Sequence, residues 1–217
     1  MREPGGVAVV VLNWNGLEMT RACIRSLRAQ SRPPDEIVVV DNASSGCEAD
    51  ELGRELGTGG RVLRCAENLG FAGGVDAALE LLLAERRVEH VALLNNDAEA
   101  EPGWLEALLA AAGPDARIGA VASKMVFWDR PGRIENAGVW ILSSGDNLPR
   151  GRGDAAGRWD EPCDLLAFCG GAVLLRVAML ERVGMFRRDF FANFEDVDLS
   201  LRAVVAGWRI ATSRARS

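Results

Sequence analysis

The residues best suited to chemistry lie in short polar clusters that follow apolar runs of the chain. Asp41 comes directly after the apolar run 36–40 and opens the segment Asp-Asn-Ala-Ser-Ser-Gly. A carboxylate at this point can accept a hydrogen bond from the imide N–H of a nucleobase. The same segment also favours an Asx turn, so the motif alone leaves a ligand-binding and a turn-forming interpretation open.

A second cluster places two amides and a carboxylate, Asn95-Asn96-Asp97, directly after an apolar run. Mg²⁺ and Mn²⁺ prefer oxygen ligands and often use one or two carboxylates together with substrate phosphates. Asp97 is therefore a candidate metal ligand. A solvated turn before Pro102 is the alternative.

A third cluster is rich in glycine and runs from Asn68 to Gly74 ahead of a predicted helix. Glycines at a helix entrance let backbone amides approach a phosphate or a sugar closely. The spacing is not GxGxxG and the segment follows the third predicted strand, so a dinucleotide fingerprint is a poor match. A simple helix-entry loop is the alternative.

The sharpest acidic cluster, residues 195–198, opens a predicted helix next to several phenylalanines. A carboxylate there could act as a general base at the mouth of an aromatic pocket. Acidic residues also complement the positive end of a helix dipole, and Asn193 with Asp196 resembles a capping box. Both interpretations fit the residues.

The elements that must position these clusters alternate regularly. Apolar runs predict strands, and the segments between them have helical spacing. The predicted strands are 7–12, 36–40, 61–65, 90–94, 117–123 and 165–176, and the predicted helices are 16–30, 48–56, 72–86, 102–112, 178–183 and 195–206. This order indicates an α/β fold with a mainly parallel sheet and helices on both faces. In such sheets ligands bind beyond the carboxyl ends of the strands. Three polar clusters lie there: Asn13-Trp14-Asn15, Asp41–Gly46 and Asn95-Asn96-Asp97.

Residues 127–162 show no sustained period, and we expect hairpins and a long loop over the open end of the sheet. The chain has 217 residues, 48% of them hydrophobic and 26% charged, which predicts a single folded domain over 1–217. The net charge of −6 argues against a duplex nucleic-acid partner.

The longest uncharged stretch, 165–175, is shorter than the roughly 18 residues of a membrane span, and no signal peptide is visible. We therefore expect a cytoplasmic protein, with peripheral contact at the inner face of a membrane left open. The five cysteines are an odd number without a CxxC pair, which favours buried, reduced thiols. His90 is the only histidine and is expected to begin a strand.

Taken in order, these segments resemble family 2 glycosyltransferases with the GT-A fold, and within them the rhamnosyltransferase-like branch. The matching segments are Val9–Gly16, Val40–Ser44, Asn68–Gly74, Leu93–Asp97, Pro102–Leu105, Gly170–Ala172, Gly184–Phe186, Phe190–Leu199 and Arg202 with Gly207–Arg209.

The resemblance implies an inverting hexosyltransferase of cell-surface polysaccharide biosynthesis. It would move a sugar, with rhamnose as one candidate, from a dTDP- or UDP-sugar to a hydroxyl of a glycan or lipid-linked acceptor. Asp97 would hold Mg²⁺ or Mn²⁺, and Asp196, with Glu195 beside it, would stand at the general-base position. The resemblance assigns nucleotide-sugar binding to Asn13, Asn15, Asp41, Asn68, Gly73, Gly74, Asp76, Asn95, Asn96, Gly170 and Gly171.

Two departures from the family pattern stand out. Asp76 occupies a position where relatives usually carry asparagine, which adds negative charge. The family pattern also continues past Ile210 with a further strand and a histidine that often completes the metal site, whereas only Ala211–Ser217, polar and arginine-bearing, follows here. We therefore expect a fragment that lacks the C-terminal part of its domain.

Two other functions remain open from the sequence. One is a non-catalytic remnant that binds nucleotide sugars. The other is a sugar nucleotidyltransferase on a similar sheet, although the first strand lacks a lysine-bearing glycine-rich loop that would support it.

Overall fold

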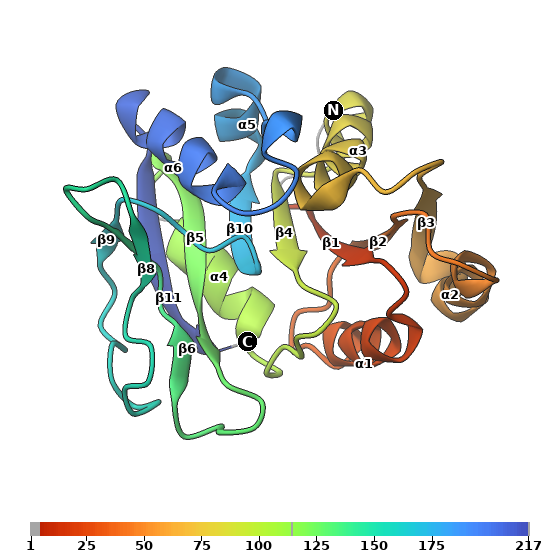
Figure 1. Ribbon diagram of the computed structural model, residues 1–217, viewed down its shortest axis with the longest axis horizontal. Coiled ribbons are helices and arrows are strands. Elements are labelled where there is room, and N and C mark those ends of the chain that lie inside the picture. Colours follow the sequence, from red (N-terminus) through yellow and green to blue (C-terminus); the bar gives the residue numbers. More distant parts are fainter. Residues whose placement is uncertain (1–4, 114, 217) are drawn as a thin grey trace.

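A computed structural model describes residues 5–113 and 115–216 of the protein. Within these residues one large sheet has the strand order β3-β2-β1-β4-β10-β5-β11-β9, and β6 pairs with β5 at its side (Figure 1). The strands of this sheet are β1 (Val7–Asn13), β2 (Glu36–Asp41), β3 (Gly60–Arg64), β4 (His90–Leu94), β5 (Ile118–Val126), β6 (Ile134–Asn136), β9 (Asp164–Leu165), β10 (Ala172–Arg176) and β11 (Arg209–Arg216).

The sheet is mainly parallel, as the alternation of strands and helices predicts. β1 pairs in parallel with β2 and β4, β2 with β3, and β5 with β11. β10 runs antiparallel between β4 and β5, so its amino end lies at the edge where β4 and β5 have their carboxyl ends. One edge of the sheet therefore gathers most of the polar clusters.

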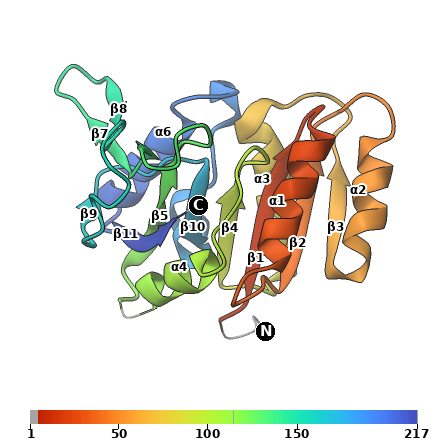
Figure 2. The same cartoon turned by 90° about the horizontal axis from the view of Figure 1, so that it is seen from below.

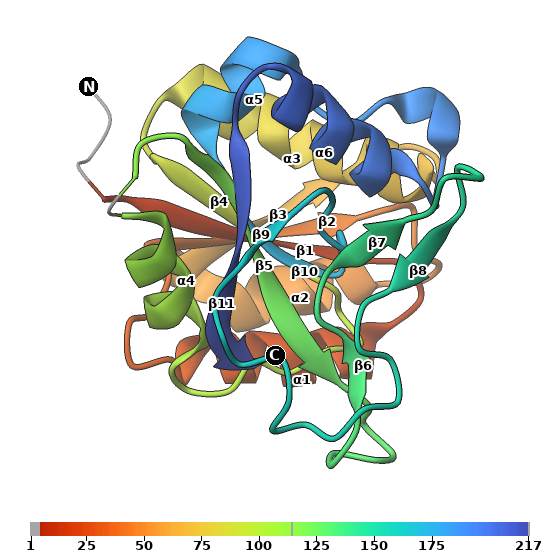
Figure 3. The same cartoon turned by 90° about the vertical axis from the view of Figure 1, so that its left-hand side faces the viewer.

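Helices cover both faces of the sheet (Figure 3), because the strand residues alternate between two apolar cores. In β1, Ala8 and Val10 belong to one core and Val7, Val9 and Val11 to the other. The first core packs against α3 (Gly70–Glu85), α5 (Val177–Val183) and α6 (Glu195–Val205). The second packs against α1 (Leu17–Arg28), α2 (Glu48–Leu56) and α4 (Trp104–Ala112), which face the viewer in Figure 2. The α/β architecture is confirmed.

The last strand corrects an expectation from the sequence. The sequence predicts no strand after Ile210, but β11 runs on through this polar stretch and pairs in parallel with β5 and antiparallel with β9. Its inner residue Ile210 is fully buried, and the Arg209 guanidinium bonds to Asp115 and Asp164 at 2.8 and 2.7 Å. Pairing on both sides supplies the backbone hydrogen bonds that a polar sequence pattern does not reveal.

The 127–162 segment forms a small layer beside the carboxyl edge of the sheet. It contains β6 and a hairpin of β7 (Val139–Ile141) with β8 (Asn147–Pro149). The end of this segment is held by the buried Lys124 of β5. Its Nζ donates a hydrogen bond to the Ala156 carbonyl at 2.8 Å and pairs with Asp160. The hairpins expected in this segment are present.

Cysteine and histidine placement agrees only in part with expectation. Of the five free cysteines, Cys23 is buried, whereas Cys47 is exposed and the other three are half-buried, so burial as a general property of the thiols is wrong. His90 begins β4 as predicted, and burial lowers its pKa to about 4. Among the described residues, no helix has the length and apolar character that a membrane crossing needs.

Candidate functional site

The carboxyl edge of the sheet brings together residues that are far apart in the chain. Asn13 at the end of β1 is the register partner of Asp41 at the end of β2. Next to them, the Asn95 N–H that follows β4 donates to the Gly171 carbonyl at 2.8 Å, just before β10. Three of the clusters therefore lie along one edge, as the parallel topology requires.

Asn13 lies beside Asp41 on the neighbouring strand and orients its carboxylate. The Asn13 amide nitrogen donates to Asp41 Oδ1 at 3.0 Å and to Glu48 Oε2 at 2.9 Å, and its oxygen accepts the Thr20 hydroxyl at 2.6 Å. Asn13 is fully buried and Asp41 is 5% exposed. A nucleoside at this edge would thus meet Asp41, with Asn13 acting through it.

A turn held by the Asp41 side chain is present, although its hydrogen bond comes from three residues along the chain and not from the two of an Asx turn. The Ser44 N–H donates to Asp41 Oδ2 at 3.3 Å, and the exposed Asn15 accepts the Ser45 N–H through Oδ1 at 2.8 Å. The turn and a nucleoside contact are compatible, because each carboxylate oxygen has more than one acceptor direction. Nucleoside recognition by Asp41 stays a prediction.

The glycine-rich segment lets α3 approach the ends of β1 and β2. A Cβ atom on Gly74 would lie 2.5 Å from Leu12 Cδ1, and one on Gly73 would lie 2.8 Å from Leu69 Cβ. Asn68 closes the turn, because its Oδ1 accepts both the Asn42 amide at 2.9 Å and the Gly70 N–H at 2.8 Å. The glycines therefore have a packing role in addition to any contact with a ligand.

The Asp76 side chain is buried between α3 and the loop that follows α5. Its Oδ1 accepts the Phe186 N–H at 3.0 Å, and its Oδ2 lies 3.8 Å from the Arg188 guanidinium. The side chain is 4% exposed, and burial raises its pKa from 3.8 to about 6. Asp76 ties α3 to the loop before the short 3-10 helix Arg188–Phe190.

Replacing Asp76 by asparagine is expected to raise the free energy of unfolding at pH 8 by about 1–3 kcal/mol. The pKa of Asp76 is higher in the folded than in the unfolded state. Its contribution to stability is therefore fully present below pH 4, where the group is protonated, and is lost as the pH rises through 6. Asparagine keeps an oxygen for the Phe186 N–H without a buried charge.

Urea unfolding of both proteins at pH 4 and pH 8 checks this expectation. The gain should be present at pH 8 and nearly absent at pH 4. Glu80→Gln is the matched control, because Glu80 also pairs with Arg188 but is 56% exposed. An equal gain from the control, or a loss at pH 8, would contradict the assigned cause.

The three residues Asn95-Asn96-Asp97 do not point to one place. Asn95 lines a cavity shared with α6, whereas Asn96 and the exposed Asp97 line a hollow of about 370 Å³ with Met19 and Trp128. Within residues 5–113 and 115–216, no three acidic, thiol or imidazole groups gather closely enough to hold a metal ion.

Asp196 stands at the start of α6 and is fixed by the strand-side loop. Its Oδ2 accepts the Gly170 N–H at 2.9 Å and its Oδ1 accepts the Val197 N–H at 2.8 Å. Burial raises the pKa of this carboxyl above its usual value. The proposed capping box is wrong: the residue before the helix is Phe194, in a left-handed conformation with φ of 68°, and no side chain caps the helix.

Glu195 beside it is more deeply buried and has a free oxygen. It is 5% exposed, and its buried Oε2 has no hydrogen-bond partner in the described structure. Burial, with a further contribution from the negative charge of Asp196, raises its pKa to about 7. Such an unpaired carboxyl is costly to the fold, and shifted carboxyls of this kind concentrate at functional sites.

A cavity of about 440 Å³ connects these groups. Its walls are the start of α6, the glycine pair before β10, Asn95, and part of the 127–162 segment. The segment contributes Glu135, Asn136, Val139, Asn147, Pro149 and Arg152. Sequence reasoning missed these residues, since the segment has no period that would orient its side chains.

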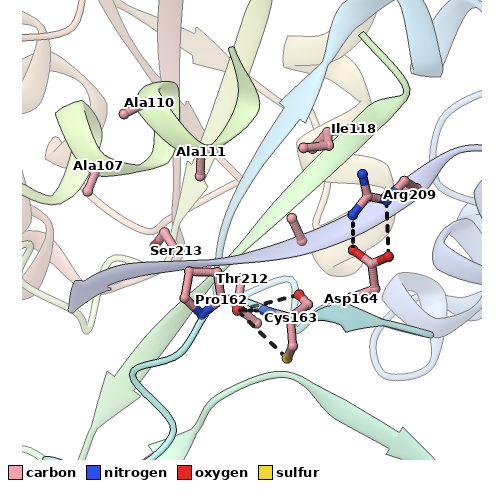
Figure 4. Close-up of a pocket in the computed structure, with 11 residues that line it drawn as sticks. Ala107, Ala110, Ala111, Ile118, Pro162, Cys163, Asp164, Arg209, Thr212 and Ser213 are labelled. Carbon is pink, nitrogen blue, oxygen red and sulfur yellow. Dashed lines mark hydrogen bonds and ion pairs between the residues drawn. The ribbon is translucent and has the colours of Figure 1, made fainter. Parts of the chain in front are cut away.

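A second hollow, of about 610 Å³, lies between α4 and β11 (Figure 4). Its lining is largely apolar, with three alanines of α4 on one side, and its charged pair Asp164 and Arg209 is joined at 2.7 Å. Groups already paired in this way offer no base or free ligand, so this hollow lacks the chemistry of the 440 Å³ cavity.

The fold defines the class of protein. The solved structure of GalNAc-T7 with UDP, GalNAc and Mn²⁺ superposes with a TM-score of 0.78 at 16% identity, over 97% of this chain and 43% of that one. The mannosyltransferase PcManGT from Pyrobaculum calidifontis, in complex with GDP-Man and Mn²⁺, gives 0.65 at 20% identity, over 97% and 56%. The chain has the GT-A fold.

The family follows from the sequence comparison. The family model "Glycosyl transferase family 2" matches residues 8–184, and the chain belongs to glycosyltransferase family 2. It is 30% identical to the uncharacterized protein y4gI of Sinorhizobium fredii and 27% identical to the O-antigen biosynthesis protein RfbC of Myxococcus xanthus. The chain spans only 23% and 16% of the length of these two relatives.

Proposed function

We propose that this chain is an inverting glycosyltransferase that moves a sugar from a dTDP- or UDP-sugar to a hydroxyl of a glycan or lipid-linked acceptor. The observation that carries the proposal is Asp196, a half-buried carboxylate held by two backbone N–H groups in the wall of a polar cavity. Membership of family 2 speaks against the nucleotidyltransferase alternative.

In the proposed reaction Asp196 is the general base. The acceptor oxygen attacks the anomeric carbon from the face opposite the diphosphate, and the carboxylate takes the hydroxyl proton as the new C–O bond forms. The bond between the anomeric carbon and the diphosphate breaks, and its electron pair leaves with the diphosphate. A raised pKa suits a base, because it increases the affinity of the carboxylate for the proton in transit.

The residues after β4 fit a hard divalent cation, although they cannot hold one alone. Asp97 and the two neighbouring amides offer only oxygen among their acceptors, and Asp97 is exposed at the sheet edge. Mg²⁺ or Mn²⁺ would offset the charge of the departing diphosphate. The fold neighbours that carry Mn²⁺ together with UDP or GDP-Man support the same expectation.

Metal binding is accordingly expected to depend on nucleotide. Asp97 is the one carboxylate of the Asn95–Asp97 cluster, so titration of Mn²⁺ alone should show weak affinity. Addition of UDP should strengthen it, because phosphates supply further oxygens. Asp97→Asn should lose that gain. Tight Mn²⁺ binding without nucleotide, unchanged in Asp97→Asn, would refute the assignment. The matched control is Glu101→Gln, at an exposed carboxylate outside this hollow.

A thermal-shift panel of dTDP-, UDP- and GDP-sugars, followed by assay of nucleoside diphosphate release, tests the proposal as a whole. Stabilisation by dTDP- or UDP-sugars and release on adding acceptor are the expected results. Binding without release would leave the alternative of a non-catalytic nucleotide-sugar binder. Rhamnose as the donor sugar, a role in cell-surface polysaccharide synthesis and action at the inner membrane face are finer predictions of the same proposal.

A further inference from the structure

The 440 Å³ cavity has the lining expected of a subsite for one sugar unit. Around Asp196 it presents carboxylates and amides on several sides, and Phe194, Val139 and Met125 add apolar surface. Hydroxyl groups can donate to carboxylates and exchange hydrogen bonds with amides, while the C–H face of a sugar ring packs against apolar side chains. The amides are Asn95, Asn136, Asn147 and Asn193.

The charges in this cavity are strongly one-sided. Glu135, Glu195 and Asp196 contribute three carboxyl groups, and Arg152 is the one basic residue among the lining positions. Burial, with further contributions from the negative charges of the same three carboxyls, raises the pKa of Cys169 to about 11, so all three lie close to that thiol. Arg152 is exposed and lies over the Phe127 ring, 5.3 Å from its centroid.

A second observation, independent of the charges, is that one carboxyl group of the cavity lining has an oxygen without a hydrogen-bond partner. Glu195 lines the cavity and is only 5% exposed, and its Oε2 has no hydrogen-bond partner among the described residues. A buried unpaired acceptor is stabilised when a ligand hydroxyl donates to it. A ligand hydroxyl that reaches this oxygen from the cavity would supply the missing donor.

We infer that the cavity is the acceptor subsite, that it takes a neutral, hydroxyl-rich sugar unit, and that Glu135 on β6 sets the preference against an acidic sugar. The inference rests on the proposed glycosyl transfer and specifies its acceptor. A uronic acid or sugar phosphate in this cavity would lie among three carboxyl groups with little compensating charge, which is unfavourable in a partly desolvated site. A neutral sugar meets no such penalty.

Glu135 is the residue that can tune this preference without touching the base. It lies on β6, in a different element from α6, and is half-buried. Its replacement by glutamine keeps the shape and one acceptor oxygen and removes one negative charge. Asp129→Asn is the matched control, because it removes a charge from the same 127–162 segment at a side chain that is 72% exposed and outside the cavity lining.

The test measures sugar binding by saturation-transfer NMR, with UDP and Mg²⁺ present and no turnover required. The probes are the methyl glycosides of glucose, galactose, mannose and rhamnose, each titrated against methyl glucuronide and methyl glucoside 6-phosphate. We expect at least one neutral glycoside to bind about tenfold more tightly than the acidic probes. Glu135→Gln should narrow that ratio at least about threefold, and Asp129→Asn should leave it unchanged.

Several outcomes would overturn the inference. These are equal or tighter binding of the acidic probes, absence of saturation transfer to every neutral glycoside, or an unchanged ratio in a folded Glu135→Gln protein. The comparison of neutral and acidic probes uses the parent chain, so it decides even if the variant fails to fold. Calorimetry with UDP on the same samples separates this inference from the proposed function. If the parent chain binds neutral glycosides but not UDP, the proposed function is refuted and the sugar subsite is not.

Discussion

Transfer by the Asp196→Asn protein is expected to be about 10²–10⁴-fold slower than transfer by the parent, with an unchanged Kd for the donor nucleotide. The physical reason is that an amide cannot take the acceptor proton, whereas the substitution leaves size and shape almost intact. The rate is measured as nucleoside diphosphate release with one of the neutral methyl glycosides named above as acceptor. Calorimetry with UDP gives the Kd.

The stability of this variant is expected to fall only slightly. Asp196 accepts one backbone N–H at each oxygen, from Gly170 and from Val197, and asparagine offers only one oxygen. One N–H loses its partner, which costs about 1 kcal/mol. A loss of transfer far larger than the loss of stability therefore identifies a chemical role.

Asp198→Asn supplies the matched control on the same helix. Asp198 accepts a hydrogen bond from Arg202 Nε at 2.8 Å and does not line the cavity. We expect a modest decrease in Tm with transfer nearly unchanged. If the two variants lost transfer equally, or if Asp196→Asn lost transfer only in step with its stability, the base assignment would be wrong.

The pH profile gives a second measure of the same residue. A base must be ionised, so the rate is expected to rise with pH through the pKa of Asp196, which burial places above the ordinary aspartate value of 3.8. Asp196→Asn should remove this acidic limb from the small remaining activity. A limb retained in the variant would assign the titration to another group.

The sheet could be predicted from the sequence because its physics is local. Runs such as 7–12 and 37–40 are apolar at every position, which is typical of strands buried on both faces. The helical spacing between them forces parallel connections. Polar residues that end such strands must meet at one edge. This is why Asp41 and Asn95 could be placed near a common site.

β11 could not be predicted in this way. Thr212 and Ser213 are polar, yet they are only 6% and 4% exposed because β5 and β9 flank the strand on both sides. The decisive contacts are non-local, such as the Cys163 N–H that donates to Thr212 Oγ1 at 3.0 Å. A single sequence carries little signal for such pairing.

The acceptor side of the site was equally hidden. Glu135 and Arg152 lie in a segment with no sustained period, so neither residue could be assigned to a face. Asp76 shows the converse limit: it lies in the first turns of the helix that the glycine-rich segment opens, and its carboxylate accepts the Phe186 N–H, a contact that the sequence does not reveal. Motif position predicts the element, and packing decides the direction of the side chain.

The pyrimidine nucleoside diphosphate is expected to bind about 10–150-fold more weakly to Asp41→Ala, the range of about 1.5–3 kcal/mol for a charged hydrogen bond. Calorimetry with UDP measures the change. Because the turn formed with Ser44 would also be disturbed, Asp41→Asn is the sharper variant: its amide can still accept from Asn13, but it can donate to a base.

Base selectivity separates recognition by Asp41 from a merely structural role. Uracil offers an imide N–H to a carboxylate, whereas cytosine offers an acceptor at that position, so the parent should prefer UDP over CDP and Asp41→Asn should lose or reverse that preference. Asp50→Asn, at a side chain that is 61% exposed and paired with Arg64, should change neither affinity. A structural role predicts equal weakening for both nucleotides. That result, or an unchanged affinity for UDP in Asp41→Ala, would leave Asp41 with only its role in the turn with Ser44.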